Sequence, residues 1–204
     1  MKIKMKYYNL YLIRHGESES NQNKKVLLTK PDNQLELTNR GKQQIENAIK
    51  FLPSYEWCSM FVSPYVRTRQ SADIIREQYK KNNIQYFERL EDPRIREIET
   101  ATRLGEKQIT DFSNKDFWDY GRFFYRMDTG ESIADVYDRV SSFINSLHIM
   151  SQMGELHDNI VVVTHALTMR VFKMIIEKDT VENFYDYKKP INAEVWRFDL
   201  KLLS

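Results

Sequence analysis

The chain is nearly without cysteine: Cys58 is the single one among 204 residues. One cysteine excludes an intramolecular disulfide and any metal cluster built on cysteine thiolates. The composition suits a reducing compartment, so we expect a cytoplasmic protein. Because Cys58 directly precedes an apolar run, we expect a buried small hydrophobic side chain there and not a nucleophile.

The chain also has little net charge and no long apolar run. Its 31 Lys and Arg against 29 Asp and Glu leave a formal charge of +2, which gives no general attraction to nucleic acid or to a membrane surface. Nothing approaches the ~20 apolar residues of a membrane span. The basic start at Lys2, Lys4 and Lys6 resembles an export signal, but no small-residue cleavage site follows, so we expect a first strand.

What the chain does contain is an alternation of strand-like and helix-like patterns. Four runs are typical of strands: Tyr8–Ile13, Met60–Val62, Ile160–Thr164 and Glu194–Phe198. The third is apolar without alternation, as in a strand buried on both faces. Helical spacing occupies the stretches between these runs. This order predicts one α/β domain over residues 1–204, a three-layer α/β/α sandwich around a mostly parallel sheet.

Two helix starts and one irregular stretch stand out within this pattern. Ser63-Pro64 predicts a helix that begins with Ser as N-cap and Pro as the first helical residue. Ser132 and Asp135 have the spacing of a capping box. Glu99–Tyr125 is polar, aromatic and irregular, and we expect an insertion or lid over one end of the sheet.

The first strand-like run ends abruptly in Arg14-His15-Gly16. We expect the glycine to let the backbone turn tightly after the strand. The planar guanidinium of Arg14 suits phosphate oxygens, and Asn21 can add a further donor. His15 is a candidate nucleophile. The segment therefore predicts a phosphate-binding site at the end of a strand.

A second histidine, His165, follows the apolar strand that ends at Thr164. Ligands of parallel sheets bind outside the carboxyl ends of the strands, so we expect His15 and His165 to face one pocket. Neither histidine has Asp or Cys residues nearby at metal-ligand spacing. We therefore expect no metal at this site.

Phosphate monoester cleavage needs both more positive charge and an acid. This reaction requires enhancements of up to ~10²¹-fold, so charge on the phosphoryl oxygens and on the leaving oxygen must both be met. Arg67 and a protonated His165 are candidates for the first role, with Arg69 a weaker one. Glu97 is our candidate for the acid, and Glu17 and Glu99 are rivals that spacing alone does not exclude.

Five motifs follow one another along the chain and together resemble one known family. They are Leu12-Ile13-Arg14-His15-Gly16-Glu17-Ser18 with Asn21, Leu37-Thr38 with Gly41 and Gln44, Ser63-Pro64 with Arg67-Thr68 and Gln70-Ser71-Ala72, Ile95-Arg96-Glu97, and Val163-Thr164-His165-Ala166. In this order they resemble the histidine phosphatase superfamily, the phosphoglycerate mutase-like proteins. The stretch 120–140 resembles a short, fungal-type subgroup. One departure is Ala101, where the family usually has glycine after its acidic residue.

The resemblance implies a role for each matching residue. His15 would become phosphohistidine, and Glu97 would protonate the leaving alcohol and then activate water. The phosphoryl group would be bound by Arg14, Arg67 and His165, with Asn21 and the backbone N–H of Ala166 assisting. Candidate substrate contacts are Glu17, Ser18, Arg122 and Arg126, although the two arginines also fit a solvated basic face packed on aromatic side chains.

The sequence favours one activity and leaves two alternatives. We expect a metal-independent phosphomonoesterase without a cofactor, because only residues 199–204 follow the last predicted strand and leave little material for a tail that excludes water. A phosphoglycerate mutase or bisphosphatase is the first alternative, and only the mutase would need 2,3-bisphosphoglycerate. A non-catalytic binding protein on the same fold is the second. The substrate would be a small phosphorylated metabolite or a phosphoprotein, and a homodimer is compatible with the chain.

Overall fold

The computed structural model describes residues 5–54, 57–84, 90–99, 121–126 and 130–203. Its centre is a five-stranded sheet with the strand order β3-β2-β4-β1-β5. The strands are β1 (Met5–Arg14), β2 (Cys58–Val62), β3 (Leu90–Glu91), β4 (Asn159–Thr164) and β5 (Val195–Leu203). All neighbouring pairs are parallel except β1 with β5, which is antiparallel. The predicted, mostly parallel sheet is therefore confirmed.

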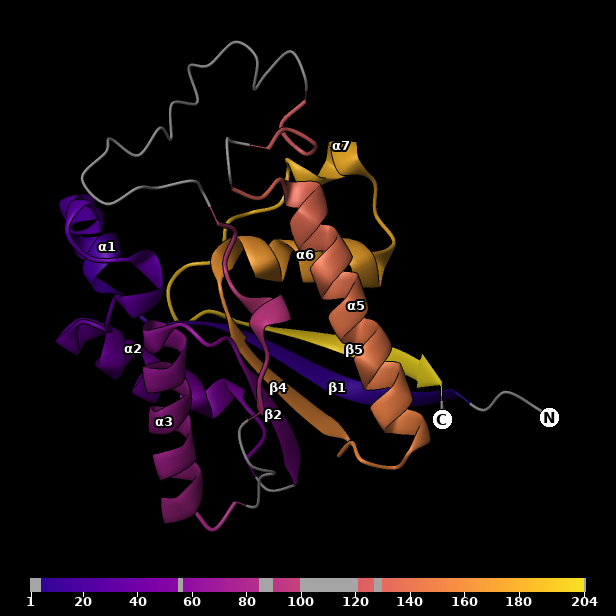
Figure 1. Ribbon diagram of the computed structural model, residues 1–204. Helices are drawn as coiled ribbons and strands as arrows, with labels where there is room; N and C mark the ends of the chain where they lie inside the picture. Colours follow the sequence, from indigo (N-terminus) through magenta and orange to yellow (C-terminus); the bar gives the residue numbers. More distant parts are fainter. Residues whose placement is uncertain (1–4, 55–56, 85–89, 100–120, 127–129, 204) are drawn as a thin grey trace.

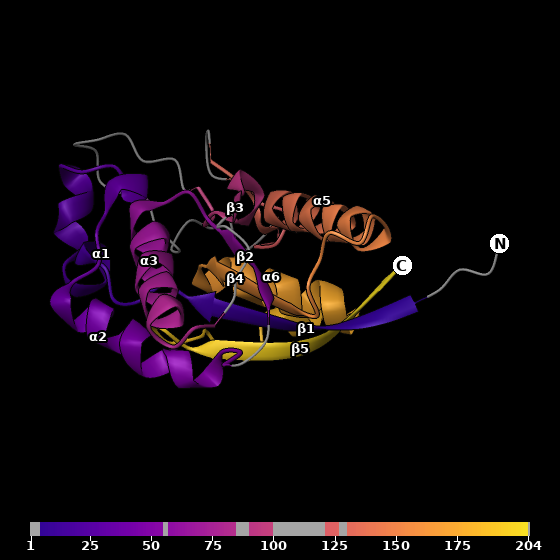
Figure 2. The same cartoon turned by 90° about the horizontal axis from the view of Figure 1, so that it is seen from below.

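Helices cover both faces of this sheet (Figures 1 and 2). The helices α2 (Asn39–Ala48) and α3 (Val66–Lys81) lie together on one face, and α5 (Ile133–Gln152) and α6 (Ala166–Glu177) lie together on the other. Short helices complete the described chain: α1 (Glu19–Gln22), α7 (Val181–Phe184), and the 3-10 turns η1 (Lys24–Leu28), η2 (Asp32–Gln34), η3 (Ile49–Phe51) and η4 (Pro93–Ile95). This arrangement is the predicted three-layer α/β/α sandwich.

The strand β4 shows why its run is apolar without alternation. Ile160 and Val162 enter the core beneath α5 and α6, whereas Val161 and Val163 enter the core beneath α2 and α3. Side chains alternate between the two faces of a strand. Because helices cover both faces of β4, all four side chains are fully buried. Cys58 is also buried, and burial raises the pKa of its thiol to about 12, as expected for a packing residue.

The strand register brings three chain segments to one edge of the sheet. Arg14 at the end of β1 pairs with Thr164 at the end of β4, and Val62 at the end of β2 pairs with Val163. The next residues continue this pairing: the His15 N–H donates to the Thr164 carbonyl at 3.0 Å. The carboxyl ends of β1, β2 and β4 therefore lie side by side.

The two predicted helix starts have different outcomes. Ser132 and Asp135 form the expected capping box, with the Asp135 N–H donating to Ser132 Oγ at 3.1 Å and the Ser132 N–H donating to the Asp135 carboxylate at 2.7 Å. The prediction for Ser63-Pro64 is wrong, because α3 begins at Val66. The Ser63 N–H still donates to the Val163 carbonyl at 3.0 Å and so extends the sheet pairing, which delays the helix.

Gly16 is required because a side chain there would collide with the backbone of α2, and not because its own backbone makes an unusual turn. Its φ angle is not positive, so the expected conformational reason is wrong. A Cβ atom at Gly16 would lie 2.2 Å from the carbonyl oxygen of Gly41 in α2, and a Cβ at Gly41 would lie 2.1 Å from the carbonyl oxygen of Glu17. Two glycines therefore let α2 pack directly against the backbone that follows His15.

The segment that carries Glu97 has no regular structure of its own and is held by Arg139 of α5. The Arg139 guanidinium donates to the carbonyl oxygens of Arg94, Arg96 and Glu97 at 2.6, 2.8 and 3.2 Å. It also forms an ion pair with Glu131 at 2.9 Å, in which both side chains are nearly buried. A single guanidinium thus orients the backbone around Glu97.

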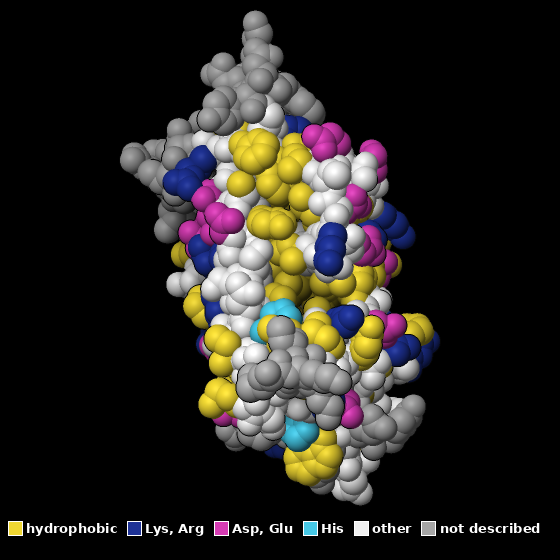
Figure 3. Space-filling model, turned by 90° about the vertical axis from the view of Figure 1, so that its right-hand side faces the viewer, with side chains coloured by type: hydrophobic (Ala, Val, Ile, Leu, Met, Phe, Trp, Pro, Cys, Tyr) yellow, Lys and Arg dark blue, Asp and Glu magenta, His cyan; other side chains and the backbone are white. Residues whose placement is uncertain are grey.

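Apolar side chains gather in the middle of one face of the molecule and charged side chains flank them (Figure 3). The homodimer stays a prediction. Over the described ranges, every helix is too short or too polar to cross a membrane.

We expect Gly41→Ala to destabilise the protein. Helix propensity alone would make this change stabilising by about 1 kcal/mol, whereas the clash with the Glu17 carbonyl should reverse the sign and cost about 1–3 kcal/mol. Urea unfolding of Gly41→Ala beside Gln43→Ala, an exposed position of the same helix, measures the effect. A stabilised Gly41→Ala would contradict the close approach.

We expect Arg139→Met to lower the free energy of unfolding by about 1–3 kcal/mol. The change removes the donor to three backbone carbonyls and one of the ion pairs of the nearly buried Glu131, which keeps its pair with Arg96. Arg126→Met is the control, since the Arg126–Asp135 pair lies at the surface and its loss should leave the unfolding midpoint nearly unchanged. Equal midpoints for the two variants would argue against the Arg139 contacts described here.

Candidate active site

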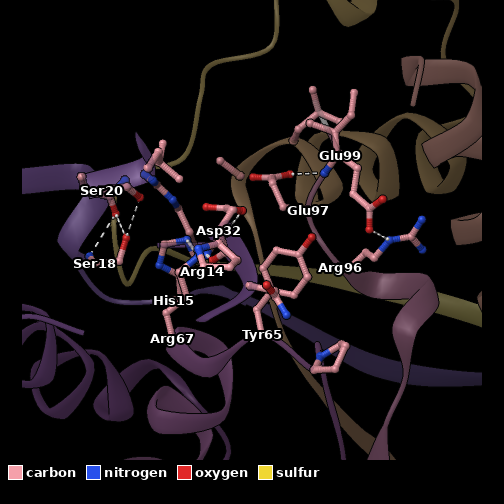
Figure 4. Close-up of a pocket in the computed structure, with 18 of the residues that line it drawn as sticks. Arg14, His15, Ser18, Ser20, Asp32, Tyr65, Arg67, Arg96, Glu97 and Glu99 are labelled. Carbon is pink, nitrogen blue, oxygen red and sulfur yellow. Dashed lines mark hydrogen bonds and ion pairs between the residues drawn. The ribbon is translucent and has the colours of Figure 1, made fainter. Parts of the chain in front are cut away.

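A cavity of about 1060 Å³ opens at the carboxyl ends of the strands (Figure 4). Its volume is at the upper end of the range for small-molecule sites. Most of the residues predicted for the site line it, namely Arg14, His15, Ser18, Asn21, Arg67, Glu97 and Ala166. These side chains come from β1, α1, α3, α6 and the segment that follows η4. The structure therefore brings distant parts of the chain to one cavity.

His15 has one ring nitrogen occupied and one directed to the neighbouring arginine. Its Nδ1 lies 2.7 Å from the Gly16 carbonyl oxygen, which assigns the proton to Nδ1. The Arg67 Nε–H donates to His15 Nε2 at 3.3 Å. Burial lowers the pKa of His15 well below its usual value, and the charges of Arg67 and Arg14 lower it further. The imidazole is therefore neutral at neutral pH, and Nε2 is its unprotonated nitrogen.

Arg14 and Arg67 supply positive charge beside His15, but their partners differ. Arg14 donates from Nη1 to the Pro190 carbonyl at 2.9 Å, and its Nε has no hydrogen-bond partner among the described residues. Arg67 forms an ion pair with the Asp32 carboxylate at 2.9 Å. In Arg67, an internal carboxylate thus occupies the guanidinium face that would bind a phosphoryl oxygen.

His165 lies directly behind His15, with 5.2 Å between the ring centroids. Its Nε2 is 2.7 Å from Ser63 Oγ, and its Nδ1 is buried and has no partner in the described part of the chain. Burial and the nearby Arg67 lower the pKa of His165 well below its usual value. His165 is therefore neutral in this arrangement, and the expected protonated form, which would require the negative charge of a phosphoryl group, stays a prediction.

The three candidate acids have different surroundings. Glu97 points toward the side of the cavity that holds Arg14 and Asp32, and burial raises the pKa of its carboxyl group although Arg67 opposes the shift (Figure 4). Glu99 is more than half exposed and pairs with Arg96 at 3.0 Å. Glu17 accepts from Thr38 Oγ1 at 2.9 Å and does not line the cavity. The geometry favours Glu97, whose partly buried carboxyl group lines the cavity and forms no ion pair with a cation among the described residues.

Asn21 and Ala166 lie at the cavity with groups that can donate hydrogen bonds. Asn21 accepts from the Ser18 N–H at 3.1 Å and from Asn192 at 2.9 Å through Oδ1, which leaves its amide nitrogen to donate. Ala166 is the first residue of α6, and its N–H therefore has no partner within the helix. These positions are compatible with phosphate binding, and their roles stay predictions.

Arg122 and Arg126 are not brought to the cavity. The Arg122 guanidinium lies 5.3 Å from the centroid of the Tyr185 ring, and Arg126 pairs with Asp135. Neither residue is among those that line the cavity. This placement resembles the alternative of a basic face packed on aromatic side chains. The predicted lid at Glu99–Tyr125 and the departure at Ala101 fall largely or wholly outside the described residues.

The cavity side chains that sequence reasoning missed include Asp32, Tyr65, Arg170 and Lys189. Asp32, Tyr65 and Lys189 had no pattern that could have identified them. Arg170 could have been found, because it lies four residues after Ala166 in a predicted helix, and residues four apart share a helix face.

The described residues contain no group of three or more His, Cys, Asp or Glu that could hold a metal ion. The cavity instead offers cations to an anionic ligand, with Arg14, Arg170 and Lys189 among its lining residues. These cations, beside a neutral histidine and a partly buried carboxyl group, suit an anionic ligand.

Comparison with known proteins agrees with this geometry. The family model described as "Histidine phosphatase superfamily (branch 1)" matches residues 10–201. The Arabidopsis thaliana protein named "Phosphoglycerate mutase-like protein AT74" is 38% identical over 201 residues, which is 91% of this chain. The chain spans 63% of the length of that relative. The Saccharomyces cerevisiae "Broad-range acid phosphatase DET1" is 27% identical over 94% of this chain and 85% of its own.

Solved structures share the fold. Bacillus stearothermophilus YhfR has a TM-score of 0.73 at 21% identity, with 93% of this chain and 90% of that chain covered. A mycobacterial glucosyl-3-phosphoglycerate phosphatase has a TM-score of 0.72 at 19% identity, with 96% and 97% covered. The narrower resemblance to a fungal-type subgroup stays a prediction. The family match over nearly the whole chain shows that this protein belongs to the histidine phosphatase superfamily, branch 1.

Proposed function

We propose that the protein is a metal-independent phosphomonoesterase that works through a phosphohistidine on His15. The observation that carries this proposal is the neutral His15, whose Nε2 lies 3.3 Å from Arg67 Nε in a cavity that also holds Arg14 and Glu97. The surrounding arginines attract a phosphate dianion. The neutral imidazole keeps a lone pair on Nε2, which would exchange the hydrogen bond from Arg67 Nε for attack on phosphorus.

In the first step His15 Nε2 attacks phosphorus. The P–N bond forms, the ester P–O bond breaks, and Glu97 gives its proton to the leaving alcohol oxygen. Arg14 and Arg67 would neutralise the charge on the phosphoryl oxygens. Glu97 suits this role because burial raises its pKa and so keeps the carboxyl group protonated above the usual range.

In the second step Glu97 is a carboxylate and takes a proton from a water molecule. The water oxygen attacks phosphorus, the P–N bond breaks, and inorganic phosphate leaves. This step returns His15 to the neutral imidazole and Glu97 to the acid, so the cycle balances without a metal or a cofactor.

A mutase is the second candidate, because it shares the first step and because a relative carries the name phosphoglycerate mutase-like. Only that activity would involve 2,3-bisphosphoglycerate. The name of the yeast relative supports the phosphatase. A binding protein without catalysis is less well supported, since the nucleophile, both arginines, the acid and His165 are all present.

The proposed substrate is a small phosphorylated metabolite or a phosphoprotein, and the proposed location is the cytoplasm. The location is supported by the single, buried cysteine, which needs no oxidising environment.

We expect His15→Ala to lower phosphate release from phosphomonoesters by about three orders of magnitude or more, since it removes the nucleophile. The assay contains excess EDTA, and 3-phosphoglycerate is one of the substrates. Lys173→Met is the matched control, because Lys173 pairs with Glu177 on the exposed side of α6.

Rapid quenching with radiolabelled substrate should also trap an acid-labile, base-stable label on the wild type and none on His15→Ala. Full activity of His15→Ala would contradict the proposal. Isomerisation of 3-phosphoglycerate in the presence of bisphosphate, without phosphate release, would establish the mutase.

We expect Glu97→Gln to affect poor leaving groups most. For an alkyl phosphate, kcat/KM should fall by about 10²–10⁴-fold, whereas p-nitrophenyl phosphate, whose leaving group needs no proton, should lose much less. An equal loss for both substrates would argue against Glu97 as the acid.

We expect the pH profile to be shifted toward acid. The low pKa of His15 keeps the nucleophile neutral well below pH 6.5, so activity survives there. The pKa of Glu97 is raised, but Glu97 still loses its proton as the pH rises, and the alkaline limb reports that loss. In Glu97→Gln the alkaline limb should disappear; its persistence would assign the limb to another group.

A further inference from the structure

The cations that line the cavity fall into two sets. Lys30, Arg67 and Arg96 each form an ion pair with a carboxylate, at 2.7, 2.9 and 2.6 Å. Arg14, Arg170 and Lys189 form no ion pair with a carboxylate among the described residues. The proposed function already assigns the phosphoryl group to Arg14 as its anion. Two cations of the cavity therefore have no assigned anion.

Arg170 is held in place without being neutralised. Its Nη2 donates to the Phe184 carbonyl at 2.8 Å, and its guanidinium lies 4.4 Å from the centroid of the Phe184 ring. Its Nε is buried and has no partner in the described part of the chain. A partly buried guanidinium loses hydration, and a neutral carbonyl compensates for only part of that loss. A bound anion would complete the compensation.

The position of Arg170 sets its distance from the phosphoryl site. Arg170 follows Ala166, whose N–H is a predicted phosphate contact, by four residues on the same face of α6. A rise of 1.5 Å per residue separates the two positions by about 6 Å along the helix. This separation corresponds to a few bonds, so one small molecule can reach both.

Lys189 reaches the same cavity from the loop before β5. The next residue, Pro190, accepts the hydrogen bond from Arg14 Nη1 at 2.9 Å, so the loop passes directly beside the phosphoryl site. The Lys189 side chain is exposed at the cavity wall. A mobile, hydrated ammonium there can follow an anion that Arg170 binds.

Glu97 does not compensate Arg170 during the reaction. Its carboxyl group is the acidic group that acts on the charge of Arg170 across the cavity. In the first chemical step, however, Glu97 must be protonated and therefore neutral. The positive charge of Arg170 is then open to the substrate.

We propose that Arg170 and Lys189 form a second anion subsite, which binds a carboxylate or phosphate on the alcohol part of the substrate. The preferred substrates would then be small phosphomonoesters that carry a second anionic group a few bonds from the phosphate. This inference rests on the proposed function and assigns its substrate class. It differs from the expectation for Arg122 and Arg126, neither of which lines the cavity.

The test compares two esters that differ only in the second anion. 3-Phosphoglycerate carries a carboxylate where glycerol 1-phosphate carries a CH₂OH group. We expect the wild type to release phosphate from the acid with a kcat/KM at least about 10-fold higher, because a hydrogen bond to a charged group is worth about 10- to 100-fold. A second pair, propane-1,3-diol bisphosphate and 3-hydroxypropyl phosphate, tests whether a phosphate serves as well as a carboxylate.

The variants locate the preference. Arg170→Met should remove most of the preference for the anionic ester and change kcat/KM for the neutral ester by less than about threefold. Arg170→Lys should restore part of the preference for the anionic ester. Lys189→Met should reduce this preference less than Arg170→Met does. Lys173→Met, on the same helix as Arg170, should leave the preference unchanged. Circular dichroism and the thermal midpoint show whether Arg170→Met is folded.

Three results would overturn the inference. The first is phosphate release from the neutral ester with no preference for the anionic one, which leaves the proposed phosphatase standing. The second is an equal loss for both esters in a folded Arg170→Met, which would make Arg170 a structural residue. The third is an absence of phosphate release from every ester, p-nitrophenyl phosphate included, which would overturn the proposed function as well.

Discussion

The structure depends on the parallel pairing of β1 with β4. This pairing sets Arg14 opposite Thr164, and one residue further it places His15 in front of His165. Neither histidine could approach the other without it, because 149 residues separate them in the chain. The same register fixes the side-chain alternation of β4, so packing and chemistry share one constraint. A slip of one residue would exchange the two cores and separate the site.

The pKa shifts of the site follow from that placement. The two histidines are buried at the ends of strands and lie beside cations, which keeps both imidazoles neutral. Glu97 is held nearby by the contacts between Arg139 and the surrounding backbone carbonyls, and burial raises the pKa of its carboxyl group. Imidazoles and a carboxyl group thus share one site, and burial shifts each toward its uncharged form.

Much of the fold could be predicted because its signals are local. The apolar run of β4 and the capping box at Ser132 act over a few residues. The helix start predicted at Ser63-Pro64 was wrong, because Ser63 continues the sheet pairing and forms a hydrogen bond with His165, 102 residues away. Gly16 was predicted as important for the wrong reason, since its neighbour Gly41 belongs to another element. For the site, the strand-end residues were visible, whereas Asp32 enters only through tertiary contacts.

Under the proposed function, the ion pair between Arg67 and Asp32 makes phosphoryl binding at Arg67 an exchange of one anion for another. An incoming phosphoryl group does not meet a bare cation at Arg67, because the Asp32 carboxylate already accepts from its guanidinium. Net affinity is therefore the difference between two anions at the same donor, and a singly charged ligand gains little over the carboxylate that it displaces. A dianion offers more charge and more acceptor oxygens. The single negative charge of Asp32 thus sets the charge that a ligand must exceed to displace it from Arg67.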